Sequence, residues 1–63
     1  MLDICKANIN NKMIIVYEEG GVSDGIKGII REATEGAICV ETDFGRKIWI
    51  KPEKIVKLKE WVA

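Results

Sequence analysis

The sequence predicts a small, mainly β domain built as a five-stranded barrel or sandwich, and three observations support this class. The chain has 63 residues, which suits one small domain. Five short segments rich in β-branched and aromatic residues alternate with turn signals. Hydrophobic residues make up 48% of the chain and charged residues 32%, which is typical of a folded domain. We expect one domain over 1–63, with a cap at 1–11, a strand-rich body at 12–59 and a tail at 60–63.

The N-terminal segment is open to two interpretations. Leu2, Cys5 and Ile9 recur at the spacing of one helical face, which favours a short helix. The alternation of apolar and polar residues from Leu2 to Cys5 fits a strand almost as well. Periodicity does not separate the two over so few residues. We favour the helix and keep the strand as the alternative.

The five strands are predicted between clusters of Gly, Asn, Asp, Pro and charged residues. β-Branched and aromatic side chains fit a pleated, half-buried surface, so each apolar segment between such clusters is expected to be a strand. The first strand carries apolar residues on both faces, so another segment has to cover part of the outside of the sheet. The predicted strands are KMIIVYE (12–18), IKGIIRE (26–32), AICVET (37–42), RKIWI (46–50) and IVKLK (55–59).

The glycine-rich segment 18–25 is the longest break between predicted strands. Gly20 and Gly25 have the spacing of the two glycines in a phosphate-binding loop. Ile26 follows where that motif needs lysine, and Lys27 is not followed by Ser or Thr. We therefore interpret the segment as a flexible connector, which could form one wall of a binding site.

The segment ETDFGRKIWIKPEKI predicts a hairpin with a defined register. Residues 43–45 suit a three-residue loop in which Gly45 adopts the left-handed conformation. The register puts aliphatic pairs on one face and a charge pair on the other. Pro52 ends the ladder, and 52–54 is expected to form a tight helical turn. The predicted pairs are Ile38 with Ile50, Val40 with Ile48, Glu41 with Lys47, Cys39 with Trp49, and Ala37 with Lys51.

Catalysis, metal binding and cofactor binding are not expected. The chain has no histidine to act as a base near neutral pH, and its two cysteines do not complete a tetrahedral metal site. No carboxylate spacing singles out an acid–base pair. Cys5 and Cys39 either form a disulfide or remain free thiols, as is common in intracellular proteins. Without a membrane-length apolar run or a secretory signal, the chain is expected to be cytoplasmic.

The formal net charge is zero, but the charges are unevenly distributed along the chain. Residues 1–45 contain four basic and eight acidic residues, whereas residues 46–63 contain six basic and two acidic residues. Strands from the two parts interleave in a barrel, so this split makes a basic surface possible without requiring one.

The layout of residues 12–59 resembles the SH3-like small barrels, including their Sm-like and KOW-type versions. The resemblance rests on five short strands, a long first loop, the tight hairpin at 43–45 and the helical turn PEK before the last strand. An N-terminal helix is similar to the Sm-like arrangement. The resemblance implies a five-stranded SH3-like or Sm-like barrel. Proteins of this architecture bind RNA, DNA, ribosomes or peptides, and the architecture does not fix the function.

Lys47, Trp49 and Lys51 form the strongest candidate binding row, because alternate residues of a strand share one face about 6.6 Å apart. Tryptophan can stack on a nucleobase, and lysine can neutralise a phosphate. The alternative is structural: Trp49 lies beneath a cover made by the N-terminal segment, by Trp61 and Val62, or by a second subunit. The nucleic-acid hypothesis assigns phosphate contacts to Arg46, Lys47, Lys51 and Lys57, and base stacking to Trp49.

The lysines of the last predicted strand have two interpretations as well. Lys57 and Lys59, with Lys54 just before the strand, either contact nucleic acid or discourage unwanted pairing at a sheet edge. Trp61 is expected to act as a lid on the barrel end or as an interface anchor.

The expected function is binding rather than catalysis. The leading hypothesis is a small accessory protein that binds nucleic acid, namely RNA or a single strand. The alternative is a protein-interaction or adaptor module, or a homo-oligomeric structural protein. Zero net charge favours this alternative, because nucleic-acid-binding domains are usually basic. The expected partners are therefore RNA or DNA, another protein, or further copies of the chain, and not a membrane.

Overall fold

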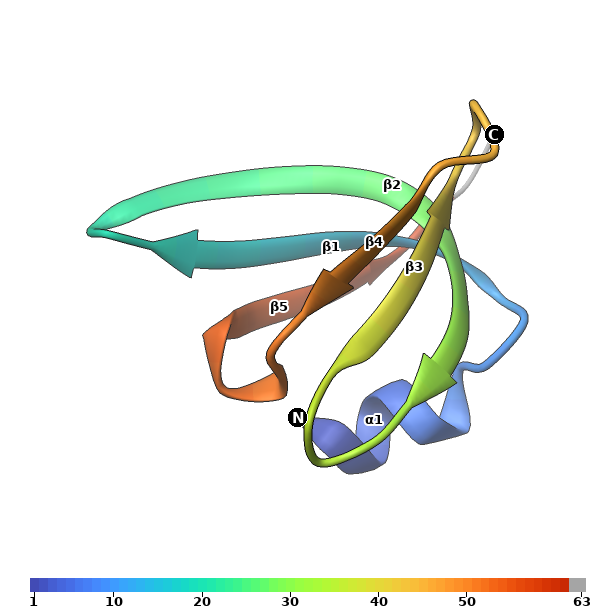
Figure 1. Cartoon of the computed structure of the whole chain (residues 1–63), viewed down its shortest axis with the longest axis horizontal. Coiled ribbons are helices and arrows are strands. Elements are labelled where there is room, and N and C mark those ends of the chain that lie inside the picture. The colour runs from blue at the N-terminus through green and yellow to red at the C-terminus, as the bar shows by residue number, and fades with distance from the viewer. Residues whose placement is uncertain (62–63) are drawn as a thin grey trace.

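The computed structural model describes residues 1–61 and consists of one antiparallel sheet preceded by a short helix (Figure 1). This arrangement confirms the five predicted strands, the helix as the form of the first segment, and the helical turn after Pro52. The elements are α1 (Leu2–Ala7), β1 (Lys12–Glu19), β2 (Val22–Ala33), β3 (Ile38–Thr42), β4 (Lys47–Ile50), the 3₁₀ turn η1 (Pro52–Lys54) and β5 (Ile55–Glu60).

The strands lie in the order β4-β3-β2-β1-β5, so β4 and β5 are the two edges of the sheet. Within residues 1–61 no hydrogen-bonded ladder joins these two edges, and the sheet is open. In Figure 1, β2 runs from its hairpin with β1 and curves round to β3, so the sheet wraps about its own inner face.

The β1–β2 hairpin corrects the prediction of a long flexible connector at 18–25. β1 continues to Glu19, β2 begins at Val22, and the two residues pair directly across the turn. Gly20 and Gly21 form the turn with φ of 61° and 80°, a conformation that suits a tight two-residue hairpin. Ser23 to Gly25 have low strand propensity, but pairing with β1 overrides that preference.

The β3–β4 hairpin confirms the predicted loop and register. The backbone N–H of Thr42 donates to the carbonyl of Arg46 at 2.8 Å, and Gly45 has φ of 76°. The ladder pairs Ile38 with Ile50, Cys39 with Trp49, Val40 with Ile48, and Glu41 with Lys47.

The core lies on the inner face of the curved sheet. α1 packs against β2 and adds Cys5, which is fully buried, while Leu2 packs against the edge of the core. Ile9 follows α1 and is 39% exposed, so it does not continue the apolar helical face. Every side chain of the buried core cluster is aliphatic or sulfur-containing: Cys5, Met13, Ile15, Ile30, Ile38, Val40, Ile50 and Ile55.

The two cysteines are free thiols, and both are buried. Cys5 belongs to the core cluster, whereas Cys39 faces outward from β3 opposite Trp49. The disulfide alternative is therefore not adopted. Burial raises the pKa of the Cys5 thiol above its ordinary value, which keeps it protonated. Within residues 1–61, every helix falls short of the length and hydropathy that a bilayer crossing requires.

Gly28 of β2 lies where β3 leaves no room for a side chain. A methyl group placed there would lie 2.6 Å from the carbonyl oxygen of Glu41 and 2.7 Å from Cγ1 of Val40. Gly28→Ala should therefore push β3 away and destabilise the domain by about 1–3 kcal/mol. Chemical denaturation measures this change.

Gly25→Ala is the matched control on the same strand, because its nearest contact would be 3.9 Å away. Equal stabilities for the Gly28→Ala and Gly25→Ala variants would show that the close approach does not constrain the sheet.

Candidate functional site

The outer face of β5, β1 and β2 carries a group of lysines that the fold assembles from distant parts of the sequence. Ile14 of β1 stands between Lys27 of β2 and Lys59 of β5 in one cross-strand row. In the next row Val16 stands opposite Lys57. We call the surface made by Lys12, Lys27, Lys57, Lys59, Ile14, Val16 and Trp61 the basic face.

Trp61 lies at one end of the basic face. Its backbone N–H donates to the carbonyl of Lys12 at 3.3 Å, which extends the pairing beyond β5. The ammonium groups of Lys12 and Lys27 lie 5.1 Å and 5.6 Å from the centroid of its ring. Both distances are within the range of cation–π attraction. Trp61 thus lies beside Lys12 and Lys27 on the outside of the sheet, but it does not cover Trp49, as the structural alternative for Trp49 required. Val62 lies outside the described residues.

The basic face contains no carboxylate among its described residues. The acidic residues of β1, Glu18 and Glu19, lie at the far tip of the hairpin, where they pair with Ser23 and Val22. Four positive charges on three adjacent strands therefore surround half-buried apolar side chains, although the whole chain is neutral. Local charge, rather than net charge, determines the electrostatic potential at this surface.

The three residues of the predicted row on β4 are all exposed. Lys47 and Trp49 occupy the outer face of the strand, and Lys51 follows its last residue. Trp49 is 57% exposed, so no described segment of the chain covers it. Arg46 precedes the strand and lines a hollow beside it.

Lys57 does not join the other predicted site residues. It lies on β5, at the opposite edge of the sheet from β4, and three strands separate the two. Between the basic face and the β4 row, Glu41 forms an ion pair with Arg31, with 3.6 Å between Nε and Oε1. The predicted nucleic-acid-binding residues therefore lie on two separate parts of the surface, with the carboxylate of Glu41 between them.

Sequence reasoning missed Lys12, Lys27 and Trp61 as members of one surface. Counting charges by position placed both lysines in the acidic part of the chain. A two-residue turn at Gly20 and Gly21 would have revealed the grouping, because it fixes Ile14 opposite Lys27.

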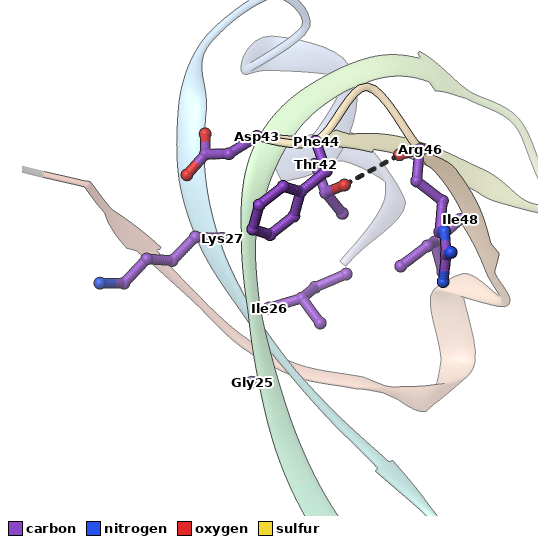
Figure 2. Close-up of a pocket in the computed structure, with 8 residues that line it drawn as sticks. All are labelled: Gly25, Ile26, Lys27, Thr42, Asp43, Phe44, Arg46 and Ile48. Atoms are coloured by element: carbon purple, nitrogen blue, oxygen red, sulfur yellow. Dashed lines mark hydrogen bonds between the residues drawn. The ribbon is translucent and has the colours of Figure 1, made fainter.

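Two hollows lie beside β4. The hairpin hollow, between β2 and the β3–β4 hairpin, has a volume of about 620 Å³. In Figure 2, the side chains of Ile26 and Ile48 point into it, while Lys27 points away. Phe44, at the tip of the hairpin, is 97% exposed. The seam hollow, of about 270 Å³, is lined by Tyr17, Glu19, Ile48, Trp49, Ile50, Lys51 and Lys54.

Ile48 lines both hollows, so they flank the same strand. In the seam hollow, Nζ of Lys54 lies 3.0 Å from Oε1 of Glu19, which joins η1 to the end of β1. Within residues 1–61, no three His, Cys, Asp or Glu side chains come together in a way that could hold a metal ion.

The chain matches no model of a known protein family, and no curated protein is significantly similar to it in sequence.

Trp49 is predicted to shield the thiol of Cys39. The two residues are directly opposite in a pair without mutual hydrogen bonds, where side chains approach most closely, and Cys39 is only 1% exposed. Trp49→Ala should therefore speed alkylation of Cys39 several-fold, as measured by iodoacetamide labelling and mass spectrometry of the modified peptides.

Cys5 is the internal control for this experiment, because its thiol lies in the core and its pKa is raised by burial. Faster labelling of both cysteines would indicate general loosening instead of local exposure. Lys47→Ala, which leaves the ring of Trp49 in place, should not change either rate.

Proposed function

We propose that this chain is a non-enzymatic binding module of the SH3-like or Sm-like small-barrel type that binds RNA or single-stranded nucleic acid. The architectural part of the proposal is supported by the strand order, by the sharply curved β2, and by the helical turn before the last strand. The short N-terminal helix α1 is a further feature that supports the Sm-like resemblance.

The observation that carries the functional proposal is the basic face. Its lysines come from β1, β2 and β5 and surround apolar side chains without an intervening carboxylate. Such a surface attracts a polyanion, and each phosphate contact releases counterions from the nucleic acid. The apolar centre formed by Ile14, Val16 and Trp61 offers contact area to sugars and bases.

The exposed Trp49 extends this proposal to the β4 edge. A single strand that leaves the basic face would pass the Arg31–Glu41 pair before it reaches Lys47, Trp49 and Lys51. An exposed tryptophan between lysines suits base stacking with flanking phosphate contacts. Arg46 provides a further positive charge at the hairpin.

A second candidate function is protein interaction. It is favoured by the nearly full exposure of Phe44 and by the apolar lining of the hairpin hollow at Ile26 and Ile48. The hollow borders the basic face, because Lys27 also lines it, although the Lys27 side chain points away from it (Figure 2).

Salt dependence and lysine substitution test the nucleic-acid proposal. Four phosphate contacts predict that the logarithm of the affinity for labelled oligouridylate falls with the logarithm of salt concentration with a slope of about −3. Lys27→Ala combined with Lys59→Ala should reduce that slope by about half and weaken binding at low salt by about tenfold or more. Fluorescence anisotropy measures both quantities.

Lys6→Ala is the matched control, because Lys6 is an exposed lysine on α1, away from the basic face. Binding that depends no more on Lys27 and Lys59 than on Lys6 would contradict the proposal. Trp49→Ala tests separately whether the nucleic acid reaches the β4 edge. Base stacking on Trp49 predicts that this variant loses about 1–3 kcal/mol of binding free energy.

A further inference from the structure

β4 presents unused backbone groups at the edge of the sheet. Thr42 and Arg46 form a hydrogen-bonded pair, with 2.8 Å between the N–H nitrogen and the carbonyl oxygen. Hydrogen-bonded and non-hydrogen-bonded pairs alternate along an antiparallel ladder, so Ile48 bonds to β3 in the same way. The backbone N–H and C=O groups of Lys47 and Trp49 therefore point away from β3. Among residues 1–61, no second strand is hydrogen-bonded to this edge of β4.

The two sides of this edge differ in chemistry. On the inner side, Ile48 stands between the hairpin hollow and the seam hollow, with Ile26 and Phe44 close by. On the outer side are Lys47 and the exposed ring of Trp49. Trp49 and the exposed Lys51, which follows β4, also line the seam hollow. The nearest carboxylate of the seam hollow, Glu19, is already paired with Lys54. A strand laid along β4 would thus meet an apolar side and a positive side.

A second copy of the chain is a poor match for this edge. The other free edge of a copy is β5, whose outer face carries Lys57 and Lys59. Pairing with β4 would bring these lysines beside Lys47, and like charges opposite one another destabilise a sheet. Antiparallel pairing of β4 with β4 centred on Trp49 would put Lys47 opposite Lys51 of the copy, again with like charges opposite one another. The charge pattern instead complements an acidic strand.

We propose that the free edge of β4 binds an extended peptide segment in which acidic and apolar residues alternate. The peptide adds a sixth strand by hydrogen bonding to the backbone of Lys47 and Trp49. Its apolar side chains enter the hollows beside Ile48, and its carboxylates lie over Lys47 and Lys51. This inference is independent of the basic face, which lies on β1, β2 and β5. It shares Lys47, Trp49 and Lys51 with the extension of the nucleic-acid proposal to the β4 edge.

The first test uses synthetic peptides as probes. A short, terminally blocked peptide of alternating valine and glutamate is compared with an alternating valine–lysine peptide. A third peptide has the valines and glutamates in separate blocks. Calorimetric titration should show binding of the valine–glutamate peptide that is at least about tenfold tighter than that of either control. Equal binding of the third peptide would overturn strand addition, because that peptide has the same charge as the first but lacks the alternation of valine and glutamate.

The second test separates backbone bonding from charge. Lys47→Ala removes one charge, whereas Lys47→Pro removes the same charge and also the outward N–H, which no bond to β3 uses. The proline variant should bind the peptide about tenfold more weakly than the alanine variant. Circular dichroism and thermal melting establish that both variants remain folded.

A third test uses the wild-type chain and so does not depend on the proline variant folding. The valine–glutamate peptide is methylated on alternate backbone nitrogens, once in each of the two registers. Strand addition predicts that methylation in one register abolishes binding and in the other leaves it nearly unchanged. Equal effects in both registers, or equal binding by the two Lys47 variants, would overturn the proposal.

Two further outcomes would show that the free edge of β4 does not bind a peptide as an added strand. If sedimentation shows an oligomer that Lys47→Pro dissociates, the edge pairs with another copy and the peptide proposal fails. If Lys47→Ala and Lys47→Pro weaken the binding of the peptide equally, and that of oligouridylate equally, the edge acts only as a charged surface to which any polyanion binds, and the proposal also fails. Loss of oligouridylate binding in the Lys27→Ala and Lys59→Ala variant, with peptide binding intact, keeps the two proposals separate.

Discussion

The two-sided pairing of β2 is the constraint on which the rest of the structure depends. β2 pairs with β1 from Val22 to Ile29 and with β3 from Gly28 to Ala33, so only a short stretch near Gly28 is bonded on both sides. The register shift between Ile30 and Glu32 and the lack of a side chain at Gly28 let the strand curve there. That curvature brings Ile15, Ile30 and Ile38 into one core. A chain of 63 residues can bury only a small core, and α1 adds Cys5 to it.

The sequence permits prediction of those parts of the fold that local chemistry determines. Gly45 requires a left-handed conformation, and the alternation around it fixes which residues of β3 and β4 face one another. The β1–β2 hairpin could not be predicted in the same way. Its strand residues, from Ser23 to Gly25, have low intrinsic propensity, and their conformation comes from pairing with β1. The order of the strands depends on long-range pairing between β1 and β5, which no local pattern reveals.

The two candidate binding surfaces also differ in whether a local sequence pattern could predict them. The row at Lys47, Trp49 and Lys51 was predictable because the three residues are close in sequence and share the period of one strand. The basic face was not, because Lys12, Lys27 and Lys59 come from strands that meet only in the folded sheet. The neutral net charge of the chain did not indicate the basic face, for a related reason. Most acidic residues of β1 and β2 lie toward the hairpin tip, while the lysines lie where β5 joins the sheet.

The two edges of the sheet carry lysines, but they differ in what lies behind them. On β5, Lys57 and Lys59 belong to the basic face, and the inner residue between them, Leu58, packs on the core. Such an edge repels other strands and offers no place for their side chains. On β4, by contrast, the inner Ile48 is half-buried and borders open space on both sides. Lysines there discourage neutral or basic strands while leaving an acidic strand with apolar side chains able to pair. The same residue type therefore protects one edge and makes the other selective.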